Sequence, residues 1–81
     1  MPYITQDAKT RIFQGDVPST PGELNYRITQ VLRCYLHLHG TNYTTLNDCL
    51  GALEGAKLEL YRRVVVPYEE SKRELNGEVY F

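Results

Sequence analysis

The chain has 81 residues, 42% of them hydrophobic, and a formal net charge of −1. This length predicts one domain, residues 1–81, near the lower size limit for a self-sufficient core. The near-neutral charge argues against binding to nucleic-acid polymers, and no apolar run reaches the roughly 18–20 residues that span a bilayer. The first residues do not resemble a signal peptide, and the two cysteines form no disulfide framework, so we expect a cytoplasmic protein.

Residues 6–14 are predicted to form a short helix. Thr5 is suited to cap its start, and Gly15 is suited to the left-handed position that closes it. A helix this short is not stable in water, so it must dock on another element. An extended conformation is also compatible with this segment. The apolar edge of the predicted helix consists of Ile4, Ala8, Ile12 and Phe13.

A second helix is predicted to begin at a capping box, Thr20-Pro21-Gly22-Glu23, and to end at Gly40. Its apolar residues recur every three or four positions, and we expect this stripe to face inward. A polar and aromatic stripe on the opposite side suits a partner protein or a nucleobase, although an ordinary solvated face has the same pattern. The inward stripe comprises Leu24, Ile28, Val31, Leu32 and Tyr35, and the polar stripe comprises Tyr26, Gln30, Arg33 and His37.

A third helix follows a short link, which predicts that the two long helices pair as an antiparallel hairpin. Thr44 or Thr45 is expected to cap it. Pro67 is expected to kink or end it near Val66, and a last helical segment should then run to Asn76-Gly77. The fold class is therefore all-α, a helical hairpin with short flanking helices. The apolar residues on one side of the third helix are Leu46, Cys49, Leu50, Leu53, Ala56, Leu60 and Val64.

Other features of the third helix predict self-association. Gly51 and Gly55 lie four residues apart, where another backbone could approach closely, and each glycine costs a helix about 0.8–1 kcal/mol relative to alanine. Leu58 and Val66 project away from the apolar stripe. We expect these four residues to contribute to a homo-oligomer interface.

Polar residues near the end of the same helix predict a ligand site. Lys57 and Tyr61 lie beside the apolar stripe, with Glu54 at its edge, and an ammonium next to a phenol suits an anion with a ring. The alternative is that Lys57 pairs with Glu54 on the surface. Arg62 and Arg63 can bind phosphate or carboxylate, or can simply pair with Glu59.

Neither a metal centre nor a catalytic centre is predicted. Cys34 and His37 are one turn apart, but His39 points away from His37, and Cys49 fits the apolar stripe, so zinc is not favoured. No Ser or Cys is placed with a base and an orienting acid. We therefore expect a protein that is not an enzyme and has no cofactor.

The segments GELNYRIT and LNDCLGALEGAKLELYRRVVVPYEESKRELNGEVY resemble a family of uncharacterised short proteins encoded by phages and bacteria. The resemblance extends over nearly the whole chain but implies no activity. A weaker, architectural similarity links the chain to phage anti-CBASS sponge proteins, through the spacing of Leu53-Glu54, Ala56, Tyr61 and Arg62. Sponge proteins are short helical oligomers that sequester cyclic oligonucleotides without cleaving them.

The leading hypothesis is sequestration of an anionic, nucleotide-like small molecule in a pocket between subunits. The residues expected to line this pocket are Lys57, Tyr61, Arg62, Arg63, Tyr26 and Arg33. The alternative is a protein-interaction module that binds a host or phage enzyme through the stripe containing Tyr26, Arg33 and His37.

Overall fold

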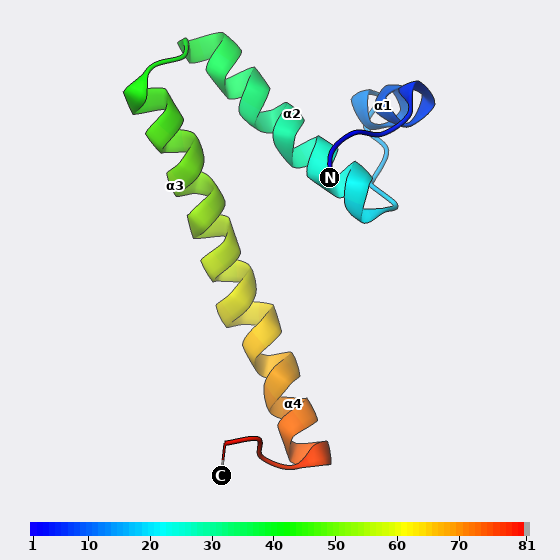
Figure 1. The fold of residues 1–81 in the computed structure, drawn as a ribbon, viewed down its shortest axis with the longest axis vertical. Helices are drawn as coiled ribbons and strands as arrows, with labels where there is room; N and C mark the ends of the chain where they lie inside the picture. The colour runs from blue at the N-terminus through cyan, green and yellow to red at the C-terminus, as the bar shows by residue number, and fades with distance from the viewer. Residues whose placement is uncertain (81) are drawn as a thin grey trace. The chain divides into compact units, whose positions relative to one another are not determined.

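The computed structural model describes residues 1–80, whose regular secondary structure is helical without any strand (Figure 1). The chain divides into two units, Met1–Leu46 and Asn47–Phe81, and each is described by itself. The all-α prediction is confirmed, whereas the antiparallel pairing of the two long helices stays a prediction. The elements in chain order are α1 (Gln6–Phe13), α2 (Pro21–His39), α3 (Tyr43–Leu60), the π-helical segment η1 (Tyr61–Val65) and α4 (Val66–Asn76).

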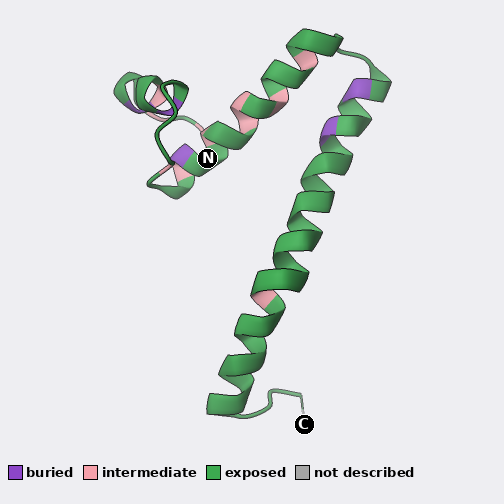
Figure 2. Cartoon of the chain, turned by 180° about the vertical axis from the view of Figure 1, so that it is seen from behind, coloured by how far each residue is buried: buried purple, intermediate pink, exposed green. Residues whose placement is uncertain are grey.

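The first unit is organised by the docking of α1 on α2. The Thr5 side chain caps α1 by accepting a hydrogen bond from the Ala8 amide at 3.2 Å, as predicted. Ala8 and Ile12 are buried, and Ile12 is completely inaccessible (Figure 2). The prediction for Phe13 was wrong, because its ring is 78% exposed. The short helix thus buries Ala8 and Ile12 and leaves its aromatic residue at the surface.

A buried carboxylate joins the two helices of this unit. Thr20 caps α2 by accepting from the Glu23 amide at 3.1 Å, as the capping box predicts. The Glu23 carboxylate, however, reaches past Thr20 and accepts hydrogen bonds from both the amide and the hydroxyl of Ser19. Its other oxygen accepts from Arg11 of α1 at 2.9 Å. One side chain therefore fixes the loop, the start of α2 and the end of α1.

Gly22 allows the N-terminal segment to cross the first turn of α2. A Cβ atom at this position would lie 3.1 Å from the Met1 carbonyl oxygen and 3.3 Å from a methyl group of Ile4. Both distances are shorter than an ordinary van der Waals contact. The glycine of the capping box is thus required by the close approach of the segment that precedes α1.

The start of α3 is capped differently from the prediction. Asn42, not Thr44 or Thr45, is the cap residue, and its side-chain oxygen accepts from the Thr45 amide at 3.0 Å. Thr45 is the reciprocal partner, since its hydroxyl accepts from the Asn42 amide and donates to the Gly40 carbonyl. This exchange satisfies amides that the first turn of a helix leaves without partners.

In the second unit, the helix continues through Pro67 without ending. As predicted, Pro67 lies in the first turn of the last helical segment, α4; the helix does not stop there, and the π-helical segment η1 precedes the proline. A proline lacks an amide and its ring collides with the carbonyl four residues earlier. In η1 the Val66 amide donates to the Tyr61 carbonyl, five residues back, and this wider turn shifts the register ahead of the ring. Pro67 then lies in the first turn of α4, where a missing amide costs nothing.

The apolar stripes predicted to face inward are largely exposed. In α2, Leu24 and Val31 are each 54% exposed. In α3, Leu50 is 65% exposed, although Cys49 is buried. Burying such a side chain is worth about 1.5–3 kcal/mol, so covering these stripes would stabilise the protein.

The C-terminal tail folds back on the end of α4. Glu78 accepts hydrogen bonds from the amides of Val79 and Tyr80, and Arg73 donates to it at 3.3 Å. The Tyr80 amide is the main cause of the lowered pKa of Glu78. The predicted closure of the last helix before Gly77 is confirmed. Phe81, which we expected to be part of an extended tail, lies outside the described residues.

Candidate functional site

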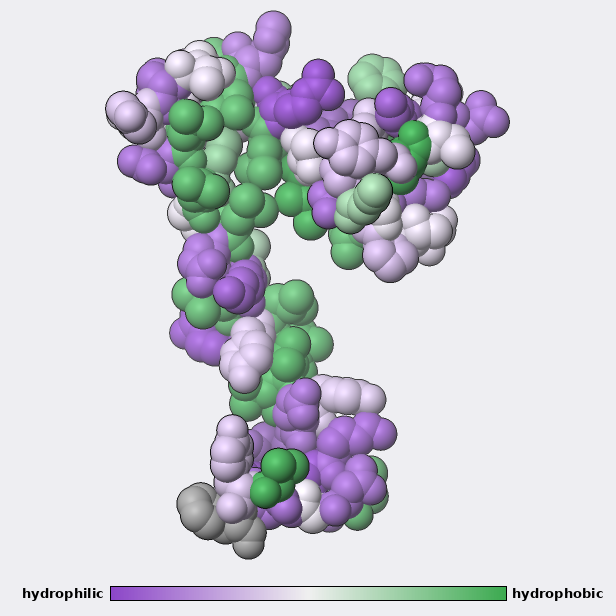
Figure 3. Space-filling view, in the orientation of Figure 1, coloured by the Kyte–Doolittle hydropathy of each residue, from purple (hydrophilic) through white to green (hydrophobic). Residues whose placement is uncertain are grey.

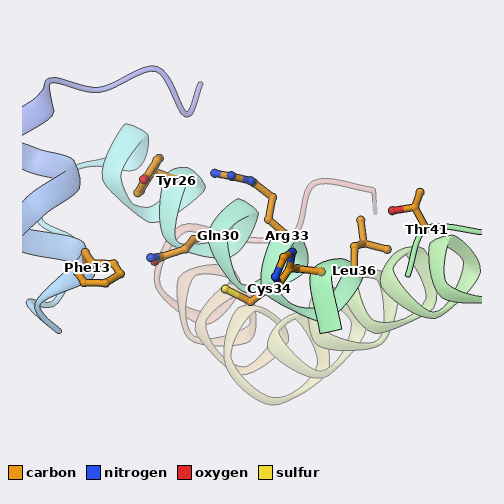
Figure 4. Close-up of a pocket in the computed structure, with 8 residues that line it drawn as sticks. Phe13, Tyr26, Gln30, Arg33, Cys34, Leu36 and Thr41 are labelled. Atoms are coloured by element: carbon orange, nitrogen blue, oxygen red, sulfur yellow. The ribbon is translucent and has the colours of Figure 1, made fainter. Parts of the chain in front are cut away.

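The first unit carries an open groove along α2. Its volume is about 640 Å³, and it is bounded at one end by the ring of Phe13 from α1 (Figure 4). The groove follows the polar stripe of α2, because side chains three or four residues apart share one side of a helix. Its lining residues are Phe13, Tyr26, Gln30, Arg33, Cys34, Leu36, His37 and Thr41.

The groove combines rings, a cation and an amide. Arg33 extends back along α2 toward Tyr26, and Gln30 rises between Tyr26 and Phe13 (Figure 4). The Gln30 side-chain oxygen accepts a hydrogen bond from Arg27 at 2.9 Å, which holds this amide in place. A guanidinium beside aromatic rings suits a ligand that has both a negative group and a flat ring.

A smaller hollow adjoins the groove on the side of α1. It has a volume of about 280 Å³, and it shares Phe13 and Tyr26 with the groove. Its other lining residues are Gln6, Lys9 and Thr10 of α1. A ligand in the groove could therefore extend past the two rings toward the Lys9 ammonium.

The Arg11–Glu23 pair determines where Phe13 lies relative to Tyr26. Glu23 is 6% exposed. The hydrogen bond from Arg11, followed by that from the Ser19 amide, lowers the pKa of Glu23, and the Arg11 pKa is raised for the same reason. Both groups are therefore charged when the unit is folded at neutral pH. The groove depends on this pair, because the pair joins α1, which carries Phe13, to α2, which carries Tyr26.

Four of the predicted ligand residues lie in the second unit. Lys57 is 3.6 Å from a Glu54 carboxylate oxygen, which is the surface pair considered as the alternative. Arg62 and Arg63 both bind the Glu59 carboxylate. The side chains of all three basic residues are at least two-thirds exposed, and Tyr61 is exposed as well.

The structure thus brings Tyr26 and Arg33 together in the groove and places Lys57, Tyr61, Arg62 and Arg63 along the other unit. The predicted interface residues also belong to the second unit. A Cβ atom at Gly51 or Gly55 would meet nothing within 4 Å, and Leu58 and Val66 are exposed. All four interface residues are accessible to a partner, and their role stays a prediction.

Several groove residues were not identified from the sequence. Phe13 was assigned to the apolar edge of α1, and Lys9 had no assigned role. Cys34 was considered only as a zinc ligand, yet it lines the groove as a free thiol. The position of Cys34, four residues after Gln30 of the polar stripe, could have indicated that it lies on the same side of α2. No sequence signal could have indicated that Phe13 closes the groove, because this depends on the docking of α1.

Across residues 1–80, no three side chains of the kinds that bind metals gather at one place. None of the helices in this part of the chain is long and apolar enough to cross a membrane. The fold and the groove define a small all-helical protein with an open polar and aromatic surface groove.

The chain belongs to the family described as a domain of unknown function, DUF6899, whose model matches residues 1–79. This membership confirms the resemblance to an uncharacterised family, whereas a phage origin and the similarity to sponge proteins stay predictions. No curated protein and no solved structure is significantly similar to the chain.

Proposed function

We propose that this protein is a non-enzymatic binding protein, whose α2 groove holds a small anionic molecule with an aromatic ring, such as a nucleotide derivative. The observation that supports this proposal is a hollow of about 640 Å³ lined by Tyr26, Phe13 and Arg33. Small-molecule sites have volumes of about 300–1,000 Å³ and combine apolar surface with a few polar groups.

Each groove residue has a defined part in this proposal. Arg33 binds a phosphate or carboxylate through two parallel hydrogen bonds. Tyr26 and Phe13 stack on the ring of the ligand, and base–aromatic stacking contributes about 1–3 kcal/mol. Gln30 hydrogen-bonds to the edge of the ring.

A ligand with several phosphates needs more cations than Arg33. In the proposal, Lys57, Arg62 and Arg63 supply them and Tyr61 adds a further ring, at a pocket shared between copies of the chain. Their present acidic partners, Glu54 and Glu59, do not oppose this role, because exposed ion pairs contribute only about 0–1 kcal/mol. Sequestration of such a signal, as an anti-defence activity, is supported by the architectural similarity to sponge proteins.

A thermal-shift panel of cyclic dinucleotides, cyclic trinucleotides and NAD-derived signals tests the proposal. A ligand that raises the melting temperature should bind Arg33→Gln about 10- to 100-fold more weakly, since a hydrogen bond to a charged group is worth about 1.5–3 kcal/mol. Lys72→Gln, in the second unit and outside the groove, is the control and should bind normally. The absence of a shift with every compound would contradict the proposal.

A protein-interaction module that acts through the same stripe is the second candidate. It is favoured by the openness of the groove and by the exposed Phe13 ring, since exposed aromatic residues are enriched at interfaces. Pull-down from host lysate with the wild type and with a Tyr26→Ala/Arg33→Gln variant separates the two functions. A sponge needs no protein partner, whereas an interaction module loses a specific partner in the variant.

A further inference from the structure

The helix of the second unit carries an apolar block around the π-helical segment. Val64 is 58% exposed, Val66 is 36% exposed and Tyr68 is 60% exposed. Three consecutive valines, residues 64–66, point to different sides of the helix, so the block is apolar around most of its circumference. Figure 3 shows hydrophobic side chains gathered here, with polar regions on both sides along the helix.

This block has no cover within its own unit. The nearest other segment, the C-terminal tail, leaves Val79 and Tyr80 at least 85% exposed. The helix from Tyr43 to Asn76 is about 50 Å long at about 1.5 Å per residue, whereas a helix of 19 residues, the length of α2, is about 28 Å long. A helix about 28 Å long that packs along the long helix would therefore cover little more than half of its length. Exposed apolar surface of this extent on a helix is typical of an interface.

The charges on both sides of the block are arranged with opposite signs. Arg62 and Arg63 precede it, and Glu69 and Glu70 follow it at equal distances from Val66. One turn further out the signs reverse, since Glu59 corresponds to Arg73 at the other end. An antiparallel copy centred on Val66 would therefore place each of these charges beside an opposite one.

We propose that a second copy of this chain covers the Val66 side of the block, with the two segments of residues 59–73 antiparallel and Val66 at the twofold axis. Such an isologous contact is self-complementary, because residue i of one copy meets residue j of the other and the reverse. Val66 of each copy meets at the axis and forms the apolar centre, whereas Val64 and Tyr68, two residues away from it, lie on other sides of the helix. A parallel pair would instead place Arg62 and Arg63 beside their own copies, which is repulsive.

The pairs within one chain do not prevent this arrangement. Glu59 binds Arg62 and Arg63, and Glu70 binds Arg73, all on exposed side chains. Exposed pairs of this kind are weak and exchange readily. Each carboxylate oxygen has two lone pairs, so Glu59, whose two oxygens bind Arg62 and Arg63, can still accept a hydrogen bond from the second copy.

The inference does not depend on the proposed ligand, because the mass of the protein is measured without any ligand. Light scattering of the wild type should give a mass twice the 9.4 kDa of the chain. The variants Arg62→Glu/Arg63→Glu and Glu69→Lys/Glu70→Lys each place like charges at both ends of the contact. For each variant alone, the dissociation constant of the dimer should be at least about 100-fold higher than for the wild type.

An equimolar mixture of the two variants is the decisive measurement, because every repulsive contact becomes attractive in the mixed pair. The mixture should recover the wild-type mass. Glu54→Lys/Lys57→Glu, which swaps a pair outside the block, is the control and should remain dimeric. The proposal is wrong if the wild type is monomeric, if either variant alone keeps the dimer, or if the mixture stays monomeric.

Discussion

The two units of this protein are stabilised by different kinds of contact. The first unit has a buried contact of its own, in which Ile12 and Ala8 of α1 are enclosed and Glu23 is held by Ser19 and Arg11. In the second unit, Cys49 is the single buried side chain among residues 47–80, and the side-chain contacts of the helix are mostly ion pairs within one or two turns (Figure 2).

This difference shows which unit can specify its own conformation. A buried, hydrogen-bonded carboxylate and an enclosed isoleucine select one arrangement of α1 and α2. Exposed pairs three or four residues apart stabilise a helix by only about 0.2–0.5 kcal/mol each and specify nothing beyond it. The second unit thus exposes most of its side chains, whereas the first unit is a small docked structure with a groove.

The largest expected effect is that of Ile12→Ala. Removing a fully enclosed isoleucine should lower the free energy of unfolding of the first unit by about 2–4 kcal/mol. Urea unfolding followed by circular dichroism measures the loss, and hydrogen exchange should localise it to α1 and the start of α2. Phe13→Ala is the matched control next to it and should cost far less, since this ring is exposed. Equal effects would mean that α1 does not dock through Ile12.

A smaller effect, dependent on pH, is expected for Glu23→Gln. Because the pKa of Glu23 is lowered in the folded state, its ionised form stabilises the first unit above the ordinary pKa of a glutamate. This contribution should be lost as the pH falls through the lowered pKa. The variant should unfold at a lower temperature at pH 7, and should lose less of its stability than the wild type on acidification. If the unfolding temperatures of the wild type and the variant changed with pH in the same way, this role for the carboxylate would be contradicted.

The smallest expected effects on stability are those of replacing one glycine in each unit by alanine. Gly51→Ala should stabilise the helix of the second unit by about 0.5–1 kcal/mol, because the new methyl group meets nothing within 4 Å. Gly22→Ala should be destabilising despite the better helix former, because the N-terminal segment must move away. Thermal unfolding measures both. If Gly51→Ala instead weakens self-association, this glycine belongs to an interface, as the sequence predicts.

Most helix ends could be predicted because they depend on neighbouring residues. Thr5, Thr20 and Gly77 act over three or four positions, and the structure has them at the predicted ends. The start of α3 was mistaken because Asn42 and Thr45 are equally good partners in a reciprocal cap, and only the backbone decides which is the cap residue. The place of Pro67 in the first turn of the last helix was predicted, whereas the π-helical turn that precedes it is indicated by no propensity.

The sequence by itself determined that the chain is all-helical and that Tyr26, Gln30, Arg33 and His37 share one side of α2, because helical periodicity is a local property. Only the tertiary structure decided that this side is a groove, since its end wall, Phe13, lies on another helix that Ile12 and Glu23 hold in place. The same distinction explains the exposed stripes. Periodicity shows which residues need cover, but cover comes from residues distant in the chain or from another molecule.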